Sequence, residues 1–545
     1  MKTTAAYRVI RTREKGRAAV ASLSLEPGEI VLQEYAVACV AAANRSVCDD
    51  CLTALAKYDR GKGEQCAGCR SLFDRRSSSS SSISNNALRG GITPQPCSAV
   101  RLAAKIIFRR CFGSLTPEQS SAIDELIHRH DGLQQHASEQ KDGRGSYEQD
   151  EEDCVQVAEL VAGMGCDERQ FSSGAPLDLA RTELGRVHLN AITTCDGSGG
   201  TGLGLFTSAA MFNHSCSPNC QAWWRGSMLE IRCTKPVAAG EELCFSYIPI
   251  DQPSSIRRAK LRHSWFFTCY CKRCATGQWD AELTGLRCPF LSCSGAVTPP
   301  WTLSKSDDGS IGDGLGRALC NKCGFNAVGE RTTAGKIGKG SCSNASTSAA
   351  ILPRSSGTAE FPVVGSTAKE QVFVDYEESR ASLLAAGTEF EDGMMAYMRE
   401  DPEVAMVALG KSVLTRERIL HPFNKELLRT LRYGSYAAIA THDWAKANWF
   451  LSRWLQPMET MFGAAEVWDV AAMRVDAGLV LDRLQATTGF PASSPSPPLP
   501  AAPRRTAHEE IAEGLKWIRI CLGRNSGLPA EIAALKVCAD RELSV

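Results

Sequence analysis

Closely spaced pairs of cysteines are the most distinctive chemical feature of this sequence. The chain contains 24 cysteines, and Cys48-x2-Cys51 is followed after fourteen residues by Cys66-x2-Cys69. Four thiolates in two such chelating pairs suit a tetrahedral structural zinc ion. Burial as small apolar side chains is the alternative, but burial gives no reason for two regularly spaced pairs. The spacing therefore predicts a zinc site at these four cysteines.

A second group of cysteines supplies only three closely spaced ligands. Cys269-x-Cys271-x2-Cys274 needs a fourth ligand from elsewhere, and Cys216, which follows an Asn-His-Ser segment, is the best candidate. A zinc ion bound by such distant segments would link them and stabilise the fold. The alternative is a redox centre or a coincidental group of three cysteines.

A third group has the spacing of a zinc ribbon. Cys288-x4-Cys293 is followed, after a long gap, by Cys320-x2-Cys323, and we predict a further zinc site there. The other cysteines have no paired spacing, default to buried or incidental thiols, and none looks like a nucleophile. They are Cys39, Cys97, Cys111, Cys154, Cys166, Cys195, Cys220, Cys233, Cys244, Cys342, Cys521 and Cys538.

Composition excludes several classes of protein. In 545 residues, 61 Lys and Arg balance 61 Asp and Glu, so no overall field attracts DNA or RNA. No apolar run approaches the roughly 18 residues of a transmembrane helix, and the first residues lack the apolar block of a signal peptide. We expect a soluble intracellular protein of several domains, with no membrane partner.

Regular elements are predicted around these motifs. Strands are expected at Tyr7–Arg11 and Glu29–Tyr35, beside the tight turn Glu26-Pro27-Gly28. Apolar residues at helical spacing predict an amphipathic helix over Ser98–Phe112. Apolar and polar segments alternate over Leu203–Tyr247 and are separated by Gly and Pro residues, so we expect this stretch to be rich in β-strands.

Polar and low-complexity segments separate these elements. The Ser-rich segment Ser77–Gly91 is expected to be a disordered insert, and the acidic segment Gln134–Asp153 to loop out. Residues 331–365 are expected to be a linker, and 490–505 a Pro-rich loop.

The last third of the chain has helical periodicity with short breaks. Lys425–Thr441 and Trp444–Leu455 show this pattern, which is typical of antiparallel helix pairs. We therefore expect an α-helical, repeat-like domain from about residue 366 onward.

Three motifs in order resemble the SET and post-SET signature of protein lysine methyltransferases. They are Phe212-Asn213-His214-Ser215-Cys216-Ser217-Pro218-Asn219-Cys220, Gly240-Glu241-Glu242-Leu243 leading to Tyr247, and Cys269-Tyr270-Cys271-Lys272-Arg273-Cys274. Upstream, Lys15-Gly16-Arg17 looks like the amino-terminal half of the SET fold, which an insertion beginning at Cys48 splits from the rest. That layout resembles the SET and MYND (SMYD-type) family, and His421-Pro422-Phe423-Asn424 looks like part of its helical carboxy-terminal domain.

The resemblance implies a multidomain α+β protein. Its β-rich SET fold is split by a partial MYND-type zinc insertion and is followed by a zinc-stabilised post-SET segment and an α-helical, TPR-like C-terminal domain. The expected segments are the N-terminal part of SET (1–47), a partial MYND-type module with the Ser-rich insert (48–97), a helical insert and SET core (98–250), a post-SET and zinc-ribbon-like segment (251–330), a linker (331–365) and the helical domain (366–545).

The resemblance also implies an activity, namely methyl transfer from S-adenosylmethionine to a lysine ε-amine of a histone or non-histone protein. Positioning and exclusion of water should supply most of the acceleration. Tyr247 is the expected catalytic residue, because its phenol can orient the amine by a hydrogen bond; a Tyr that merely ends a core strand is the alternative. The residues expected to contact the cofactor are Lys15, Gly16, Arg17, Asn190, Asn213, His214, Tyr247 and Phe267.

The chain departs from the family pattern at several positions. In the expected substrate channel, Trp265 stands where a second Tyr is common, and Ile192 stands where an aromatic residue is often found. After Cys69 the further Cys and His ligands of a MYND module are missing, so only one MYND zinc looks complete. Phe267 is expected to pack on the adenine, or alternatively to be an ordinary core aromatic.

Three functions compete at this point. The first is the methyltransferase with structural zinc, since all-thiolate sites leave no open position for water. The second is an inactive SET-MYND scaffold that binds protein partners through the helical domain. The third, a nucleic-acid-binding zinc protein, has the weakest support because no basic stripe accompanies the cysteine pairs. The substrate and the split between nucleus and cytoplasm are not encoded in recognisable motifs.

Overall fold

The computed structural model forms two compact units. The first comprises Met1–Ile248, Arg258–Cys269 and Lys516–Val545, and the second comprises Pro249–Arg257 and Tyr270–Leu515. The structure describes residues 5–13, 15–41, 97–112, 114–127, 144–163, 176–195, 201–225, 227–290, 292–299, 319–324, 376–463, 468–488 and 506–522. The predicted zinc site at Cys48, Cys51, Cys66 and Cys69, the Ser-rich insert, the linker 331–365 and the Pro-rich loop 490–505 lie outside the described residues.

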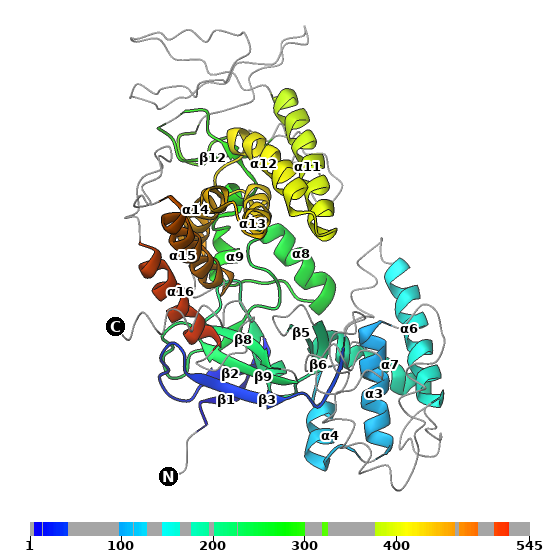
Figure 1. Ribbon diagram of the computed structural model, residues 1–545. Helices are drawn as coiled ribbons and strands as arrows, with labels where there is room; N and C mark the ends of the chain where they lie inside the picture. Colours follow the sequence, from blue (N-terminus) through cyan, green and yellow to red (C-terminus); the bar gives the residue numbers. More distant parts are fainter. Residues whose placement is uncertain are drawn as a thin grey trace, which may run out of the picture. The chain divides into compact units, whose positions relative to one another are not determined.

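The first unit is built around small β-sheets (Figure 1). The strands are β1 (Tyr7–Thr12), β2 (Gly16–Ala21), β3 (Ile30–Tyr35), β4 (Ala38–Ala41), β5 (Ala191–Cys195), β6 (Thr201–Leu205), β7 (Asn213–His214), β8 (Cys220–Arg225), β9 (Met228–Cys233) and β10 (Cys244–Phe245). β1 pairs with β2, and two three-stranded sheets have the orders β3-β9-β8 and β4-β6-β5, all antiparallel. The two predicted strands and the β-rich stretch are therefore confirmed.

The predicted turn before β3 is also present. Glu29 N–H donates to the carbonyl of Glu26 at 3.1 Å, and Gly28 has φ +94°. A side chain at that φ would be strained, so Gly is required for the turn.

The sheets of the first unit enclose one apolar core. Phe206, Phe212, Leu229, Ile231 and Leu243 are fully buried in it. Leu229 and Ile231 are two residues apart on β9 and therefore point to the same face of the sheet, whereas Phe206, Phe212 and Leu243 directly adjoin β6, β7 and β10. The core thereby fixes the strand ends that carry the motif residues.

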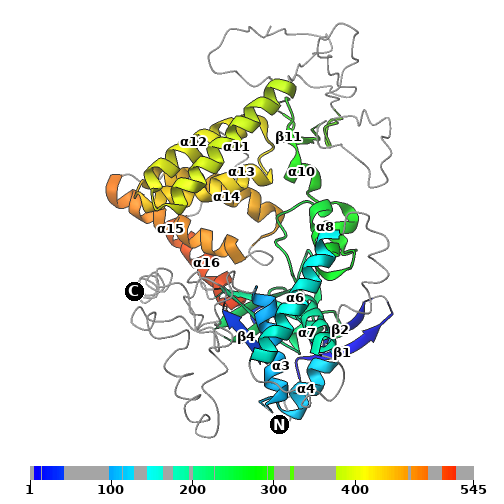
Figure 2. The ribbon, with the colours of Figure 1, turned by 90° about the vertical axis from the view of Figure 1, so that its right-hand side faces the viewer.

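Helices of the first unit gather around a second core. They are α3 (Ser98–Cys111), α4 (Pro117–Asp124), α6 (Arg144–Gly163) and α7 (Pro176–Asn190). The predicted helix at Ser98–Phe112 is confirmed as α3, with Val100, Ala103 and Ile107 buried on one face. Figure 2 shows α3, α6 and α7 side by side, in agreement with their packing contacts.

The prediction that Gln134–Asp153 loops out is wrong for its second half. Residues 144–153 belong to α6, whereas 134–143 lie outside the described residues. Val157, Leu160 and Val161 are buried at helical spacing later in the same helix. That apolar face anchors α6, and its Glu- and Gln-rich first turns extend it because these residues are good helix formers.

The second unit is mainly helical. Its shorter elements are α9 (Lys272–Thr276), α10 (Asp280–Thr284), β11 (Leu286–Arg287) and β12 (Ala296–Val297), and α8 (Ser254–Trp265) begins within it. Its longer helices are α11 (Tyr376–Met398), α12 (Pro402–Ile419), α13 (Lys425–Ala440), α14 (Trp444–Met461), α15 (Trp468–Thr488) and the start of α16 (Ala507–Leu522). The predicted helices at 425–441 and 444–455 are confirmed as α13 and α14.

Consecutive long helices pack against one another, as both ribbon views show (Figures 1 and 2). Asn424 and Asp443 accept backbone hydrogen bonds at the starts of α13 and α14, which ends each connection at a defined residue. Gly434 lets α13 approach α14 closely, since a Cβ there would lie 2.5 Å from the ring of Phe450. The C-terminal region is therefore a helical stack, and its TPR-like character stays a prediction.

A helix that spans a membrane has to be both long and apolar. Within the described parts of the chain, no helix combines the length and the apolar character needed to cross a bilayer.

Candidate functional site

The motif residues Asn213 and His214 follow a short 3₁₀ turn, η4 (Ala209–Met211). The carboxylate of Glu34 on β3 accepts the backbone N–H groups of Ser208 and Ala209, each at 2.9 Å. A carboxylate at this end of a helical turn satisfies N–H groups that otherwise have no partner. Glu34 therefore sets the point at which the chain enters β7.

Asn213 and His214 are then paired with a distant segment. β7 pairs in parallel with β10, so that Asn213 lies opposite Cys244 and His214 opposite Phe245. Asn219 extends this connection, because its Oδ1 accepts the N–H of Cys244 at 2.9 Å. The first two motifs found in the sequence are thus joined in space.

Both the backbone and the side chain of Tyr247 form hydrogen bonds. Its backbone N–H donates to Nδ1 of His214 at 3.1 Å, and its phenol Oη donates to the carbonyl of Phe212 at 2.6 Å. Both partners belong to the segment that contains β7. The predicted catalytic phenol is therefore positioned by the predicted cofactor-binding motif, and Tyr247 itself lies two residues beyond the end of β10.

Aromatic rings surround Tyr247 on the side of the post-SET segment. Ring centroids of Tyr247 and Trp265 are 5.4 Å apart, and those of His214 and Phe267 are 6.2 Å apart. Between Trp265 and Phe267 the chain bends at Phe266, which has φ +56° and directly follows the end of α8. On either side of this bend, Trp265 contacts Tyr247 and Phe267 contacts His214.

Burial controls the ionisation of Tyr247. Desolvation, with smaller effects of Cys244 and Glu242, raises the pKa of the phenol above its ordinary value of 10.0. The phenol therefore stays protonated at neutral pH. Since its proton is donated to the Phe212 carbonyl, its oxygen lone pairs are available as hydrogen-bond acceptors.

Glu242 connects two of the predicted cofactor residues. Its carboxylate accepts hydrogen bonds from Lys15 Nζ at 2.5 Å and from Asn213 Nδ2 at 2.9 Å. Asn213 Nδ2 also donates to the carbonyl of Arg17 at 2.9 Å, which joins β2 to β7. Lys15, Gly16, Arg17 and Asn213 are therefore brought together.

The backbone of Gly16 is open to close approach by another group. It has φ +69°, and a Cβ built there would meet no atom within 4 Å. The glycine thus supplies a left-handed backbone with open space above it, which other residues adopt only with strain.

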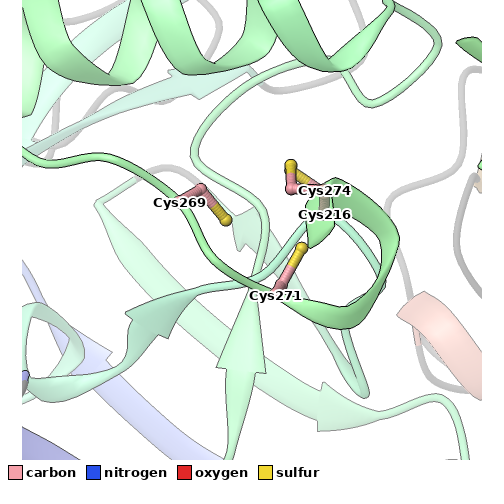
Figure 3. A group of neighbouring side chains, drawn as sticks. All are labelled: Cys216, Cys269, Cys271 and Cys274. Atoms are coloured by element: carbon pink, nitrogen blue, oxygen red, sulfur yellow. The ribbon is translucent and has the colours of Figure 1, made fainter. Parts of the chain in front are cut away.

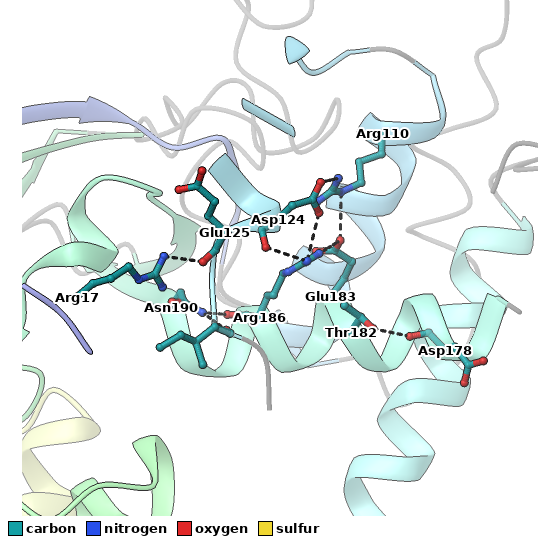
Figure 4. A network of polar contacts seen from close by, with 10 residues as sticks. Arg17, Arg110, Asp124, Glu125, Asp178, Thr182, Glu183, Arg186 and Asn190 are labelled. Carbon is teal, nitrogen blue, oxygen red and sulfur yellow. Dashed lines mark hydrogen bonds and ion pairs between the residues drawn. The ribbon is translucent and has the colours of Figure 1, made fainter. Parts of the chain in front are cut away.

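The side chains of Arg17 and Asn190 bind the helical insertion (Figure 4). Arg17 Nη1 donates to the carbonyl of Glu125 at 2.5 Å, and Asn190 Nδ2 donates to the carbonyls of Ile127 and Arg186, each at 2.8 Å. Both side chains therefore hold the short segment that follows α4.

A buried ionic group lies beside these contacts (Figure 4). The Glu183 carboxylate is within 3.1 Å of Arg110 Nε and 2.7 Å of Arg186 Nη1. Desolvation nevertheless raises the pKa of Glu183, despite the two guanidinium groups. The group joins α3 to α7. It thereby fixes the position of Asn190, the last residue of α7, and of β5, which follows directly.

Ile192, predicted to line the substrate channel, is on β5. It is partly buried and packs against the core cluster that also includes Phe212 and Tyr247. Of the two predicted channel residues, Trp265 is in ring contact with Tyr247, and Ile192 packs against the same apolar cluster as Tyr247.

The first cysteine group contains Cys216, Cys269, Cys271 and Cys274 (Figure 3). Their sulfur atoms all lie within 4.8 Å of one another, so the fourth ligand proposed from the sequence is at the site. Such a set of four thiols could hold a tetrahedral zinc ion.

Two nitrogen donors lie beside these thiols. His214 Nε2 is 3.1 Å from Cys216 Sγ, and Arg257 Nη2 is 3.3 Å from Cys274 Sγ. Hydrogen-bond donors of this kind stabilise metal-bound thiolates. Because His214 Nδ1 accepts the Tyr247 N–H, the neutral tautomer with its proton on Nε2 satisfies both contacts.

The second group contains Cys288, Cys293, Cys320 and Cys323, and its sulfur atoms also lie within 4.8 Å of one another. The spacing that resembled a zinc ribbon thus brings these four thiols together. All four cysteines are free of disulfide bonds.

Two residues that position the site were missed in the sequence. Glu34 has no motif around it, and only its place opposite η4 reveals its role. Glu242 is inside the Gly-Glu-Glu-Leu motif, which signalled the family but not the contacts of this carboxylate with Lys15 and Asn213.

Known proteins are similar to this chain in sequence. The family model of the SET domain matches residues 16–248. Human histone-lysine N-methyltransferase SMYD3 is 27% identical over 283 residues, which cover 50% of this chain and 63% of that protein. N-lysine methyltransferase SMYD2-B of Danio rerio is 36% identical over 107 residues, covering 19% of this chain and 25% of that protein.

The match to human SMYD3 thus spans less than two thirds of that protein's length. Among solved structures, Rubisco LSMT bound to AdoMet covers 50% of this chain and 53% of its own, with 13% identity and a TM-score of 0.28. The SET-domain match over residues 16–248 and the sequence similarity to SMYD3 and SMYD2-B support an SMYD-type member of the SET family.

Proposed function

We propose that this chain is an S-adenosylmethionine-dependent protein-lysine N-methyltransferase. The observation that carries the proposal is the position of Tyr247, whose phenol is bonded to the Phe212 carbonyl and whose backbone is bonded to His214. A partly buried, protonated phenol between aromatic rings can orient a small amine without ionising itself. The match to the SET domain and the relatives named as lysine methyltransferases support the same activity.

When bound, the cofactor supplies a methyl group on a positively charged sulfur. The protein then has to align a neutral lysine amine with that methyl group and exclude water. Tyr247 orients the amine by accepting a hydrogen bond, while Trp265 and Ile192 line the approach of the lysine side chain. The larger indole of Trp265 narrows its side of the channel, and Ile192 leaves more room than an aromatic ring.

The cofactor is proposed to bind where Glu242 gathers the amino-terminal loop and β7. Lys15 and Arg17 would flank its methionine end, with Gly16 allowing close backbone approach. The open space above Gly16 fits such a contact. Asn213, His214 and Phe267 would hold the adenosyl part, and Asn190 remains a further proposed contact.

Zinc is proposed to have a structural role at Cys216, Cys269, Cys271 and Cys274. The donor set fits zinc because four thiols converge and two nitrogen donors lie against their sulfurs. An ion bound there would hold the segment that carries Phe267 next to His214. The zinc would leave no open coordination position, so it stabilises the site without taking part in the chemistry.

Other proposals concern the rest of the chain. A further zinc at Cys48, Cys51, Cys66 and Cys69 in a partial MYND-type module rests on their spacing alone. The helical C-terminal region is proposed to contact protein partners, and the enzyme to act on histone or non-histone proteins in the cytoplasm, the nucleus or both.

A direct test is transfer of radiolabelled methyl groups from S-adenosylmethionine to a mixed protein extract. Label recovered as methyl-lysine after hydrolysis is the expected result, and S-adenosylhomocysteine should suppress it by competing for the cofactor site. Label in other amino acids would contradict the proposed acceptor, and failure to bind S-adenosylmethionine would contradict the proposed cofactor.

A second candidate, a catalytically weak scaffold, is favoured by one observation. The indole of Trp265 packs 5.4 Å from the ring of Tyr247, where the family often has a hydroxyl group. A scaffold would bind the cofactor without turnover. Activity that is absent in the wild type and gained in Trp265→Tyr would support this second candidate.

A further inference from the structure

The cysteine group at Cys288, Cys293, Cys320 and Cys323 has the dimensions of a metal site. Sγ of Cys288 lies 3.7 Å from Sγ of Cys323, and Sγ of Cys293 lies 3.6 Å from Sγ of Cys320. A tetrahedral ion with bonds of about 2.3 Å to sulfur requires sulfur atoms ~3.8 Å apart. A disulfide would instead need about 2.05 Å, so the arrangement fits a shared ion and not two disulfides.

The backbone around the four cysteines is shaped to bring them together. We use "ribbon" for residues 285–290, 292–297 and 319–324, which include β11 and β12. β11 pairs with β12, and Val297 on β12 forms a bridge with Cys320. Asn321 N–H donates to the carbonyl of Ala296, and the Asn321 side chain accepts the N–H of Ala296. Each half of the ribbon therefore carries one cysteine pair to the same centre.

Gly295 shows how closely the two halves approach. A Cβ at this position would lie 2.4 Å from Sγ of Cys320, a distance that real Cβ atoms do not reach. A glycine is therefore needed for the thiol of Cys320 to reach the centre, which is the arrangement expected around a bound ion.

The ribbon cannot hold itself together by strand pairing. β11 and β12 have two residues each, and isolated hairpins are marginal in water even when they are longer. Small modules with so little apolar surface are commonly stabilised by a metal ion, whose binding free energy becomes folding free energy.

The ribbon is attached to the connection between α12 and α13, here called the elbow (Leu420–Asn424). Leu286 of β11 forms a bridge with Leu420, and the carbonyl of Gly285 accepts hydrogen bonds from His421 N–H at 3.1 Å and Asn424 Nδ2 at 3.1 Å. His421 Nε2 lies 3.3 Å from the carbonyl of Ser294, which directly follows Cys293.

These elbow residues are buried, although several of them are polar. Leu420 and His421 are each 5% exposed, and Asn424 is 3% exposed. Without the ribbon, the side chains of His421 and Asn424 would lose these partners, at a cost in stability. The ribbon therefore completes the packing of the helical stack.

We infer that Cys288, Cys293, Cys320 and Cys323 bind a structural zinc ion that fastens the ribbon to the elbow between α12 and α13. Four thiolates leave no open position for a substrate, so the ion acts on folding and not on catalysis. The site is independent of the proposed methyl transfer and of the group that contains Cys271.

The test is the zinc content of the purified full-length protein, measured by inductively coupled plasma mass spectrometry. Cys293→Ser should lose about one zinc ion per chain, because three thiolates no longer complete the site. Cys97→Ser, an exposed cysteine outside both groups, is the matched control and should lose none. Unchanged zinc in Cys293→Ser, or iron in place of zinc in the wild type, would overturn the assignment.

Hydrogen exchange separates this ion from the other cysteine group. In Cys293→Ser the amides of Leu420–Asn424 should exchange faster, while those of α3 remain as in the wild type. Cys271→Ser should lose zinc from the other group and keep the elbow protected. If Cys293→Ser does not fold, wild-type protein stripped of zinc by a chelator provides the same comparison, and unchanged elbow exchange after zinc loss would refute the fastening role.

Discussion

Replacing Tyr247 with Phe tests the proposed chemistry most directly. The change removes the phenol that donates to the Phe212 carbonyl at 2.6 Å and keeps the ring between its aromatic neighbours. Phe212 is fully buried, so its carbonyl would be left without this donor. The expected loss of stability is about 1–3 kcal/mol, the cost of an unsatisfied buried acceptor.

The expected loss of activity is larger than this loss of stability. A positioned hydrogen-bonding group of this kind commonly contributes about 10²- to 10⁴-fold to the rate. That range corresponds to about 3–5 kcal/mol of transition-state stabilisation. Because folded protein remains, Tyr247→Phe should bind S-adenosylmethionine and retain its zinc while its methyl transfer falls by at least about 100-fold.

The assay compares initial rates of labelled methyl transfer at saturating cofactor with cofactor affinity by calorimetry. Tyr436→Phe is a matched control, because Tyr436 accepts a hydrogen bond from Arg432 Nε at 2.8 Å within α13. That variant should lose a comparable hydrogen bond, about 1 kcal/mol of stability, and no activity. Normal turnover in Tyr247→Phe would refute the catalytic role, and equal losses in both variants would reduce it to a structural one.

Three further outcomes are expected. Cys271→Ser should release about one zinc ion and weaken cofactor binding, and unchanged metal content would remove this cysteine from the ligand set. Glu242→Ala should weaken cofactor binding about tenfold by calorimetry, because Lys15 and Asn213 both lose the carboxylate that holds them, and unchanged affinity would refute that role. Burial lowers the pKa of His421, so below about pH 6.5 the unfolded chain binds a proton that the folded chain excludes, and stability should fall as the pH falls further. The difference between wild type and His421→Gln in denaturant titrations at several pH values isolates this effect, and parallel curves would contradict it.

Local sequence patterns predicted those helices and turns whose conformation is set by residues close together in the chain. The apolar spacing over α3 and α13 follows directly from helical geometry, and the turn at Gly28 from the backbone freedom of glycine. The cysteine pairs indicated chelation for the same reason, since residues two or three positions apart in a tight turn can reach one ion. Where a local pattern was weak, as in the polar first half of α6, the prediction was wrong because packing later in the helix decided the outcome.

The partners of the site were decided by the tertiary structure. Sequence alone named Tyr247, but only the pairing of β7 with β10 places its N–H on His214 and its phenol on the Phe212 carbonyl. Glu34 has no sequence signal, because its role depends on which strand lies beside η4. Residues far apart in the chain meet only when the core forms, so spacing identified the chemical groups and packing determined which of them act together.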